Sequence, residues 1–366
     1  MQLEVAMRSA LSLAKQGLGI CYPNPTVGCV ILDNSNNLIG LGRTSDKGRP
    51  HAEMNALNSL TASARGGTAI ITLEPCAHKN TSPSCAELLI NAGIKHVVIP
   101  ILDPDKRTNG KGVRLLEESG VKVTIGVLEK ESLDINSGFL YRLKYNRPFV
   151  SLKIASSLDG KISTFTGNSK WITGELSRLH GHSLRANHDV ILVGINTVLK
   201  DDPRLDCRIR GLNKHSPVRV IVDSSLSIPI KSNVLNNINK VPTIIWAKKN
   251  ITSQKKKTLI NMGVKIVELE NNNNNKLNLI EGLTDLSNKG FNRVLVEGGS
   301  EISASLMANN LIDKVFLYRS GIFIGGDGLS SIASYNINNL DLAKRYNLLK
   351  TRILDSDVLE EWGLVS

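Results

Sequence analysis

The sequence predicts an α/β protein built from two domains. Its 366 residues are more than one ordinary domain needs, and 41% of them are hydrophobic, which is enough to fill two cores. Along most of the chain, short segments rich in β-branched residues alternate with segments of helical spacing. The alternation stops in the basic and polar segment 136–148 and then starts again. We therefore expect one domain in residues 1–147 and a second in residues 148–366.

The first domain is predicted to be a sheet with helices on both faces. Apolar side chains between Leu3 and Ala14 recur at helical spacing, so the domain should begin with a helix. The later strands are predicted at 27–33, 67–73, 96–102 and 121–127, and the helices between them at 51–60, 84–94 and 112–120. Such alternation implies a layer of helices on each side of the sheet.

The second domain shows the same alternation with elements of its own. Its strands are predicted at 149–157, 189–194, 218–225, 243–249, 264–270, 293–299 and 314–320, with helices around 175–185 and from residue 300. The run Asn271–Asn275 has low complexity and is predicted to be a solvated loop, to which we assign no function. Separate elements imply a separate core and a separate active site.

The composition excludes some classes of function. A net charge of +12, from 45 basic and 33 acidic residues, is compatible with nucleic-acid binding. However, the basic residues are scattered, and no aromatic residues interleave with them as a stacking platform requires. We expect no nucleic-acid partner, and we attribute the charge to attraction of small phosphorylated substrates. No stretch reaches about 18 apolar residues, so we expect neither a membrane span nor a signal peptide.

The cysteines argue against a disulfide framework. Five is an odd number in a long chain, and we expect the protein to lie in the reducing cytoplasm. Metal binding or burial then explains Cys76 and Cys85 better than a disulfide. The other three, Cys21, Cys29 and Cys207, have no metal-binding neighbours in the sequence and are interpreted as structural.

Two short motifs together form the pattern of a zinc site that activates water. His51 and Glu53 stand one residue apart, and a Pro-Cys pair ending at Cys76 is followed by Cys85 after eight residues. One imidazole and two thiolates leave the fourth tetrahedral position of Zn²⁺ for water, which the metal acidifies. A carboxylate beside that water can move its proton to a leaving amine. His51, Cys76 and Cys85 are therefore the predicted ligands and Glu53 the predicted proton shuttle, as in zinc nucleobase deaminases.

The expected local structure agrees with this site. Cys85 is predicted at the start of a helix and Cys76 in the loop before it, where the helix dipole and free backbone amides favour thiolates. Residues two apart in a regular helix do not share a face. His51 and Glu53 can therefore converge only if His51 caps its helix.

Four segments of the first domain resemble a known family. YPNPTVGCVI (22–31), PHAE (50–53), LEPCAHKNTSPSC (73–85) and DP (103–104) are similar to the deaminase domain of the bifunctional riboflavin biosynthesis deaminase/reductases. The long interval between the cysteines fits that family, whereas other nucleobase deaminases usually place two residues there. The resemblance implies a cytidine-deaminase-like αβα fold, with Asn24 touching the pyrimidine and His78 lining its pocket. A histidine that only orders its loop is the alternative for His78.

The loop between the cysteines departs from the family's usual form. Ala77, Asn80, Ser82 and Ser84 stand where serine, glycine, threonine and proline are common. No predicted ligand is lost, and Asn80 can adopt the left-handed conformation that a glycine often serves. The departures therefore affect substrate contacts rather than the metal.

Five segments of the second domain resemble the reductase domain of the same family, which has a dihydrofolate-reductase-like fold. They are SLKIASSLDGKIS (151–163), SKWIT (169–173), residues 184–205, VIVDSSLSIP (220–229) and VEGGS (296–300). VEGGS follows a predicted strand and opens a helix, so it is either a phosphate cradle or an ordinary turn. No G-x-G-x-x-G follows a strand, which argues against a Rossmann fold.

The resemblance also implies roles for individual residues. NADPH contacts are implied at Ala155, Trp171, Thr197, Asp201, Ser224, Gly298 and Gly299, and substrate contacts at Ser169, Arg185, Leu205, Arg208 and Glu297. Arg185 and Arg208 suit the substrate's phosphate, because a guanidinium binds it bidentately and stays charged. Lys153 and Asp201 are implied to pass protons to the opening sugar, although an ordinary turn also explains Asp201 and its neighbours.

The family's chemistry, as the resemblance implies it, is two steps of riboflavin synthesis that use Zn²⁺ and NADPH. The first domain would deaminate 2,5-diamino-6-(5-phosphoribosylamino)pyrimidin-4(3H)-one, and the second would reduce the ribose of 5-amino-6-(5-phosphoribosylamino)uracil to ribityl. The expected partner is thus a small phosphorylated pyrimidine. We also expect a homo-oligomer.

Two other functions remain open from the sequence. One is an RNA base deaminase with an unrelated C-terminal domain, which leaves the reductase motifs unexplained. The other is a basic nucleic-acid-binding module whose zinc is structural. That module would need a fourth protein ligand and would bind nucleic acid with a steep salt dependence.

Overall fold

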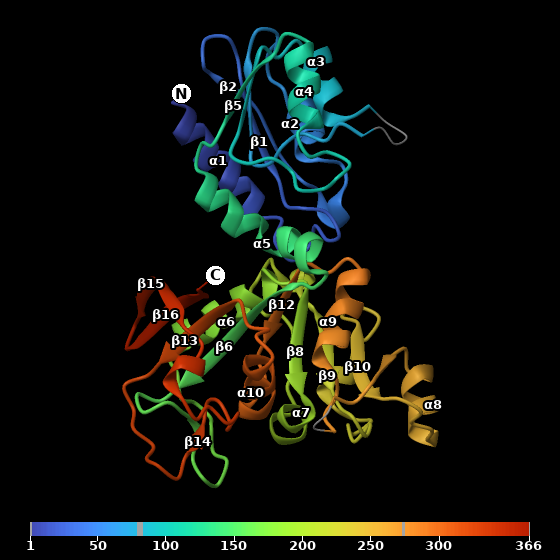
Figure 1. The fold of residues 1–366 in the computed structure, drawn as a ribbon, viewed down its shortest axis with the longest axis vertical. Helices are drawn as coiled ribbons and strands as arrows, with labels where there is room; N and C mark the ends of the chain where they lie inside the picture. The colour runs from blue at the N-terminus through green and yellow to red at the C-terminus, as the bar shows by residue number, and fades with distance from the viewer. Residues whose placement is uncertain (1, 79–82, 273–274, 366) are drawn as a thin grey trace. The chain divides into compact units, whose positions relative to one another are not determined.

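The computed structural model describes residues 2–78, 83–272 and 275–365. The chain divides into two compact units, Met1–Asn146 and Arg147–Ser366. Each unit has its own sheet and its own buried core (Figure 1). Among the described residues, no helix is long and apolar enough to cross a bilayer.

The N-terminal unit is built on a five-stranded sheet in the order β2-β1-β3-β4-β5. The strands are β1 (Gly28–Leu32), β2 (Leu38–Arg43), β3 (Thr68–Ile71), β4 (His96–Ile99) and β5 (Lys122–Ile125). β1 pairs antiparallel with β2 and with β3, whereas β3, β4 and β5 run parallel. The carboxyl ends of β3 and β4 therefore lie at one edge of the sheet, where the chain loops toward its next helices.

Helices cover both faces of this sheet, as predicted. They are α1 (Leu3–Lys15), α2 (Ala52–Asn58), α3 (Cys85–Asn91), α4 (Lys111–Glu118) and α5 (Glu129–Tyr145). One buried cluster joins α1 and α5 to the sheet through Met7 and Ile135. A second cluster joins α3 and α4 to the other face through Leu89 and Leu116. Burial of these apolar side chains holds the layers together.

Two elements of this unit were not predicted. β2 contains glycines that weaken its strand pattern, but packing requires Gly42, because a Cβ there would lie 2.3 Å from the carbonyl oxygen of Ala52 in α2. Segment 136–145, which was predicted only as a break, forms the C-terminal half of α5 and buries Phe139. Its many polar residues masked the helical pattern.

The C-terminal unit contains a nine-stranded sheet in the order β11-β10-β9-β8-β12-β6-β13-β16-β15. Its strands are β6 (Phe149–Ser156), β8 (Val190–Gly194), β9 (Val218–Val222), β10 (Thr243–Lys248), β11 (Lys265–Leu269), β12 (Arg293–Val296), β13 (Lys314–Arg319), β15 (Tyr346–Leu354) and β16 (Asp357–Leu364). The first seven strands in this order, from β11 to β13, are all parallel to their neighbours. The sheet is completed by two antiparallel strands that were not predicted, β16 and β15. β7 (Lys161–Ser163) pairs separately with β14 (Leu329–Ser330).

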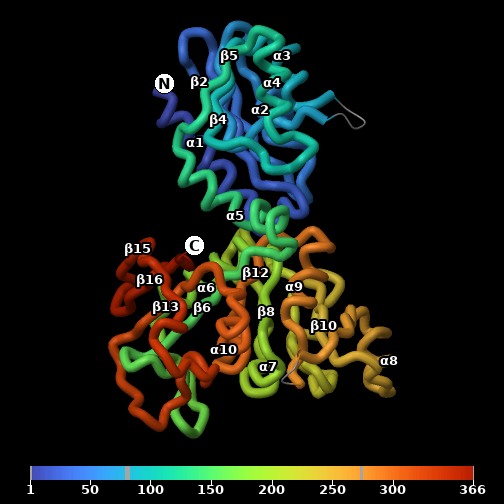
Figure 2. Tube along the Cα trace, in the orientation of Figure 1, coloured from blue at the N-terminus to red at the C-terminus, as the bar shows by residue number. Residues whose placement is uncertain are grey.

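The helices of this unit connect the parallel strands. They are α6 (Glu175–Ala186), α7 (Ile195–Asp201), α8 (Gln254–Asn261), α9 (Leu279–Asn288) and α10 (Ser300–Ala308). Short 3-10 helices occur at Asp46–Gly48 in the first unit and at Asn213–His215, Asn233–Leu235 and Leu340–Leu342 in the second. α7 follows β8 and α10 follows β12, and these two strands are neighbours (Figure 2). The N-termini of both helices therefore meet at the carboxyl edge of the sheet, where open parallel sheets bind ligands.

Candidate active sites

The three predicted metal ligands lie together in the N-terminal unit. The ligand atoms of His51, Cys76 and Cys85 all lie within 4.8 Å of one another. Nδ1 of His51 is 3.3 Å from Sγ of Cys85 and 3.8 Å from Sγ of Cys76. A zinc tetrahedron with ordinary ligand bonds of about 2.0 to 2.3 Å has edges of roughly 3.6 Å. The donors therefore fit zinc, and the set assembled from the described residues has three members, which leaves a fourth position for water.

Helix ends place these ligands. His51 is the N-cap of α2 in an extended conformation, so Glu53 stands in the first turn beside it, as predicted. Cys85 is the first residue of α3, and its backbone N–H donates to Sγ of Cys76 at 3.4 Å. Ser84 caps α3 by accepting from the N–H of Glu87 at 3.3 Å while the Glu87 carboxylate accepts from the N–H of Ser84 at 3.0 Å. The serine that departs from the family pattern thus has a structural role.

The thiols, the imidazole and the nearby carboxyl influence one another's protonation. Hydrogen bonding with Cys85, together with His51, lowers the pKa of Cys76 to about 4 despite partial burial. Burial raises the pKa of Glu53, and the charge of His51 opposes that rise. Glu53 is 4% exposed. Its carboxyl is therefore shifted toward the range in which it can both accept and return a proton.

The two predicted pyrimidine contacts differ in their surroundings. Nδ2 of Asn24 donates to the carbonyl of Gly48 at 2.7 Å, and Gly48 has φ +89, where a Cβ would lie 2.5 Å from that nitrogen. The Nδ1 atom of His78 is buried and has no hydrogen-bond partner among the described residues. Buried polar atoms are normally paired, so this nitrogen is available to a ligand. Asn80 and Ser82, two further departures from the family pattern, lie outside the described residues.

Glu74, which the sequence analysis did not single out, organises the loop after β4. It is 3% exposed, and its carboxylate accepts four backbone hydrogen bonds of 2.9 to 3.1 Å. The donors are the N–H groups of Asp103, Gly110, Gly112 and Val113. Because Glu74 stands two residues before Cys76, it ties the zinc loop to the segment that leads into α4. The sequence feature that could have identified Glu74 is its place in the segment 73–85, which also contains predicted site residues.

A cavity of about 500 Å³ opens at the carboxyl edge of the parallel strands in the C-terminal unit. The predicted residues that line it are Ser169, Thr197, Asp201, Ser224 and Gly299. Gly298, next to it, cannot carry a side chain, because a Cβ would lie 1.9 Å from Cγ2 of Ile302 in α10. The backbone before α10 therefore has no side chain at this position, and the N-terminal amides of the helix are accessible to an anion. These features fit a dinucleotide.

Three other predicted residues form a buried cluster of charges. Arg185 donates from Nε and Nη2 to the two carboxylate oxygens of Glu297 at 2.7 and 2.9 Å. Burial raises the pKa of Glu297, but Arg185 outweighs it and holds that pKa at about 2. Burial also lowers the pKa of Lys153, an effect that Glu297 partly offsets. Lys153 therefore releases its proton more readily than an exposed lysine does.

Seven predicted contact residues are not among the described residues that line the cavity: Gly298, Arg185 and Glu297, described above, and Ala155, Trp171, Leu205 and Arg208. The side chain of Leu205 is 2% exposed and belongs to the core, which leaves its backbone, at φ +54, for any ligand. Trp171 is 70% exposed, with Cζ of Arg178 4.7 Å from its ring centroid. Ala155 is half-buried in β6, and Arg208 is exposed beside His182.

Two family models match the chain in succession. Residues 1–101 match the cytidine and deoxycytidylate deaminase zinc-binding region, and residues 148–359 match the RibD C-terminal domain. The chain is 39% identical to the riboflavin biosynthesis protein RibD of Bacillus amyloliquefaciens, over 90% of this chain and 88% of that protein. It is 37% identical to RibD of Aquifex aeolicus, over 96% of both chains. The chain belongs to the RibD family.

Solved structures of RibD proteins match nearly the whole chain. RibD of Acinetobacter baumannii has a TM-score of 0.88 and 33% identity, over 100% of this chain and 99% of its own. A diaminohydroxyphosphoribosylaminopyrimidine deaminase/5-amino-6-(5-phosphoribosylamino)uracil reductase of Thermotoga maritima also has a TM-score of 0.88 and 33% identity, over 99% of both chains. The predicted fold class is confirmed: a zinc-binding deaminase domain precedes a RibD reductase domain. The alternative of an unrelated C-terminal domain is wrong.

The cavity of the C-terminal unit is also lined by charged residues that were not predicted from the sequence. Lys200, Lys276 and Glu301 line the C-terminal cavity together with the predicted residues. Lys200 stands directly before Asp201, so its position on α7 was a usable signal. Lys276 follows the asparagine run, which carried no signal of function.

Proposed function

We propose that this RibD chain catalyses two steps of riboflavin biosynthesis. The N-terminal unit deaminates 2,5-diamino-6-(5-phosphoribosylamino)pyrimidin-4(3H)-one, and the C-terminal unit reduces 5-amino-6-(5-phosphoribosylamino)uracil to the ribitylamino product with NADPH. The observation that carries the proposal is the open three-ligand set of His51, Cys76 and Cys85 beside the buried Glu53. A structural zinc would need a fourth protein ligand, which the described residues do not add to this set.

In the deaminase, Glu53 moves the protons. Zinc held by His51, Cys76 and Cys85 would supply a Lewis acid that brings the pKa of water near neutrality. Glu53 takes the two protons of the attacking water in turn and delivers one to the ring nitrogen and the other to the leaving amine, so that ammonia departs and the oxygen of water remains on the ring carbon. Burial of Glu53 raises its pKa, which lets it hold the proton between these transfers. The proposed contacts to the pyrimidine edge are Asn24 and Nδ1 of His78, which has no hydrogen-bond partner among the described residues.

In the reductase, the proposed proton donors are Lys153 and Asp201. When bound in the cavity, NADPH would supply a hydride to the sugar carbon that bears the ring amine. Once the ribose ring has opened to a C=N bond, Lys153 or Asp201 would supply the proton that its nitrogen needs. The lowered pKa of Lys153 and the place of Asp201 on the cavity wall support these roles. The proposed cofactor contacts are Ala155, Trp171, Thr197, Asp201, Ser224, Gly298 and Gly299.

The substrate's phosphate is assigned to Arg208 rather than to Arg185. The Arg185 guanidinium already makes two bonds to Glu297 and a third, from Nη1, to the carbonyl of Asp206 at 3.0 Å. Arg208 is exposed, and its guanidinium makes longer contacts, at 3.3 and 3.4 Å to Nε2 of His182 and at 3.8 Å to Oδ1 of Asp206, which a phosphate can replace. Ser169, Arg185, Leu205 and Glu297 are proposed to shape the rest of the substrate pocket.

We further propose a homo-oligomer in the cytoplasm, with small phosphorylated pyrimidines as partners and neither nucleic acid nor membrane. None of the five cysteines forms a disulfide, which agrees with a reducing compartment. The edge strand β15 exposes Leu348 and Ile353, which an interface between copies would cover. Sedimentation analysis of the full chain measures the oligomeric state.

The test of the function is to give the purified wild-type chain the diaminopyrimidine substrate with and without NADPH. Ammonia release and NADPH oxidation are followed separately. We expect ammonia in both cases and NADPH oxidation only after deamination has produced the uracil. A chain that shows neither activity on this substrate contradicts the proposal.

A further inference from the structure

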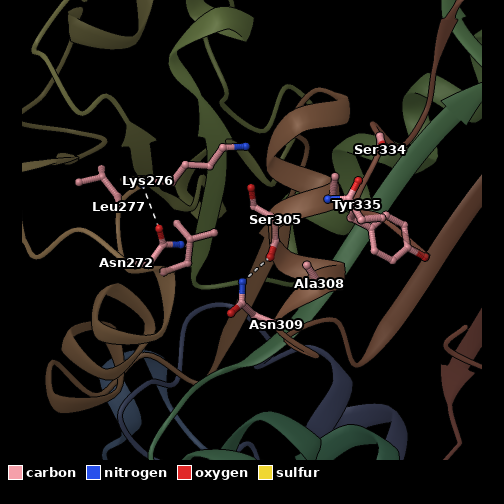
Figure 3. Close-up of a pocket in the computed structure, with 11 residues that line it drawn as sticks. Asn272, Lys276, Leu277, Ser305, Ala308, Asn309, Ser334 and Tyr335 are labelled. Carbon is pink, nitrogen blue, oxygen red and sulfur yellow. Dashed lines mark hydrogen bonds between the residues drawn. The ribbon is translucent and has the colours of Figure 1, made fainter. Parts of the chain in front are cut away.

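The described residues on either side of positions 273 and 274, between β11 and α9, are joined by hydrogen bonds. The N–H of Asn272 donates to the carbonyl of Lys276 at 2.7 Å, and the N–H of Lys276 donates to Oδ1 of Asn272 at 3.0 Å (Figure 3). Nδ2 of Asn271 donates to Oδ1 of Asn275 at 2.7 Å. Asn271 also forms an antiparallel bridge with Leu277. The asparagine side chains thus fix the backbone of Lys276.

Residues that follow Lys276 attach this part of the chain to the fold. Leu277 is 5% and Leu279 6% exposed. The N–H of Asn278 donates to the carbonyl of Glu270 at 2.9 Å, and its Oδ1 caps α9 by accepting from the N–H of Ile280 at 3.1 Å. The backbone around Lys276 is therefore anchored, and Lys276 projects from a defined place.

Lys276 lines the C-terminal cavity, and it also lines a smaller adjoining cavity of about 190 Å³ with Ser305 and Tyr335 (Figure 3). Its Nζ lies 3.5 Å from Oε2 of Glu301, in the first turn of α10, and the two side chains are 61% and 68% exposed. An exposed ion pair of this kind contributes little to stability. The ammonium can therefore leave Glu301 for a more highly charged anion.

The charges around the cavity show what Lys276 is needed for. Among the described lining residues, the cations are Lys200 and Lys276, and the anions are Asp201 and Glu301. These charges cancel, whereas NADPH brings both a diphosphate and a 2′-phosphate. The amides at the N-terminus of α10 can bind one of these groups. The other requires a side-chain cation.

We propose that Lys276 binds a phosphate group of NADPH and that the hydrogen bonds of the neighbouring asparagines serve to place it. This inference rests on the proposed reductase function of the cavity. The diphosphate and the 2′-phosphate share the chemistry that a lysine ammonium recognises. A comparison of NADPH with NADH separates the two, because NADH lacks the 2′-phosphate.

The test uses the full-length chain carrying Lys276→Ala or Lys276→Arg. Lys249→Ala is the matched control. Lys249 forms another exposed ion pair, with Glu270, and it is not among the described residues that line the cavity. Dissociation constants for NADPH and NADH are measured by nicotinamide fluorescence without substrate, and that of adenosine 2′,5′-bisphosphate by calorimetry. We expect Lys276→Ala to weaken NADPH binding about tenfold, Lys276→Arg to keep most of it, and Lys249→Ala to change nothing.

The pattern of losses identifies the phosphate. A loss confined to NADPH and the bisphosphate assigns Lys276 to the 2′-phosphate, and an equal loss for NADPH and NADH assigns it to the diphosphate. Affinities for both dinucleotides that stay within about twofold of wild type in Lys276→Ala overturn the inference. Urea unfolding followed by tryptophan fluorescence reports correct folding of the C-terminal unit in each variant, because all three tryptophans lie in this unit. If the wild-type chain itself binds neither dinucleotide, the proposed reductase function fails instead.

Discussion

Arg185 and Glu297 form a bidentate ion pair inside the C-terminal unit, with N···O distances of 2.7 and 2.9 Å. The side chains are 16% and 11% exposed, so the pair is largely shielded from water. A sequence separation of more than a hundred residues hides this pairing from sequence reasoning, which assigned both residues to the substrate. We therefore propose that Arg185 positions Glu297 and that another cation binds the phosphate of the substrate.

Arg208→Ala should therefore weaken binding of the phosphorylated uracil. The expected result is a rise of about tenfold in KM with a small change in kcat, because a charged hydrogen bond to phosphate is lost. Steady-state NADPH oxidation measures both constants. The matched control is exposed Arg210→Ala, which we expect to behave as wild type. A KM that is unchanged in Arg208→Ala contradicts the assignment.

Arg185→Ala should destabilise the C-terminal unit. Removing one partner of a buried ion pair leaves the Glu297 carboxylate uncompensated, at a cost of about 3 kcal/mol in the free energy of unfolding. Urea unfolding followed by tryptophan fluorescence reports this unit, because all three tryptophans, Trp171, Trp246 and Trp362, lie within it. The double variant with Glu297→Gln should recover part of the loss. A loss below about 1 kcal/mol, as for an exposed pair, would mean that the pair is open to solvent.

Glu74→Ala should loosen the loop that leads into α4. Four backbone N–H groups lose their acceptor, and we expect a destabilisation of about 3 kcal/mol or more, since each buried donor left unpaired costs about 1 to 3 kcal/mol. Hydrogen exchange of the amides in 103–113 should accelerate, and ammonia release should fall. Glu117→Ala, at an exposed position of α4, is the control. Unchanged exchange in Glu74→Ala would show that the loop does not depend on this carboxylate.

The stability of the C-terminal unit should fall below neutral pH because of His188. This side chain is 1% exposed, its Nδ1 lies 2.6 Å from the carbonyl of Leu184, and its Nε2 lies 3.0 Å from Oγ of Ser151. Burial, with a smaller effect of Arg293, lowers its pKa to about 3. The unfolded chain, with an ordinary histidine pKa of about 6.5, therefore binds the proton first. Stability is fully present above that value and is lost between about pH 6.5 and pH 3.

The slope of the free energy of unfolding against pH measures how strongly His188 affects stability. Urea unfolding by tryptophan fluorescence should show a loss of at least about 1.4 kcal/mol per pH unit between about pH 6 and pH 5, one proton's worth. Burial also lowers the pKa of His180 and of His182, which act in the same direction. His188→Asn should reduce the slope by about one proton. A flat wild-type profile across this interval would mean that His188 titrates normally in the folded state.

The zinc site was predictable because its geometry is local. The ends of α2 and α3 place His51 and Cys85, and the caps that end helices leave marks in the sequence. The prediction that His51 caps its helix is confirmed. The spacing of residue types in the two motifs therefore predicted both the set of metal ligands and the position of Glu53.

The reductase site was less predictable because it depends on tertiary packing. The side chain of Leu205 turns into the core and Arg185 turns to Glu297, and no local pattern encodes either choice. The need for glycine at position 42 likewise comes from the packing of α2 against β2. The role that we propose for the asparagine run, to place Lys276, was not predictable, because hydrogen bonds between asparagine side chains and the backbone leave no periodic signal.

We propose that the zinc site of this chain deaminates the pyrimidine and that a separate cavity, in the C-terminal unit, reduces the sugar. The most direct measurement compares wild type with Cys85→Ser for bound zinc, for ammonia release from the diaminopyrimidine, and for NADPH oxidation on uracil substrate that is already deaminated. Glu53→Gln is the companion variant, which should keep its zinc. We predict that both variants lose ammonia release by a factor of about 10² or more and keep NADPH oxidation near the wild-type rate. Ammonia release that survives in Cys85→Ser would contradict the role of Cys85 as a zinc ligand. Reduction that disappears together with deamination in both variants would contradict the separation of the two activities.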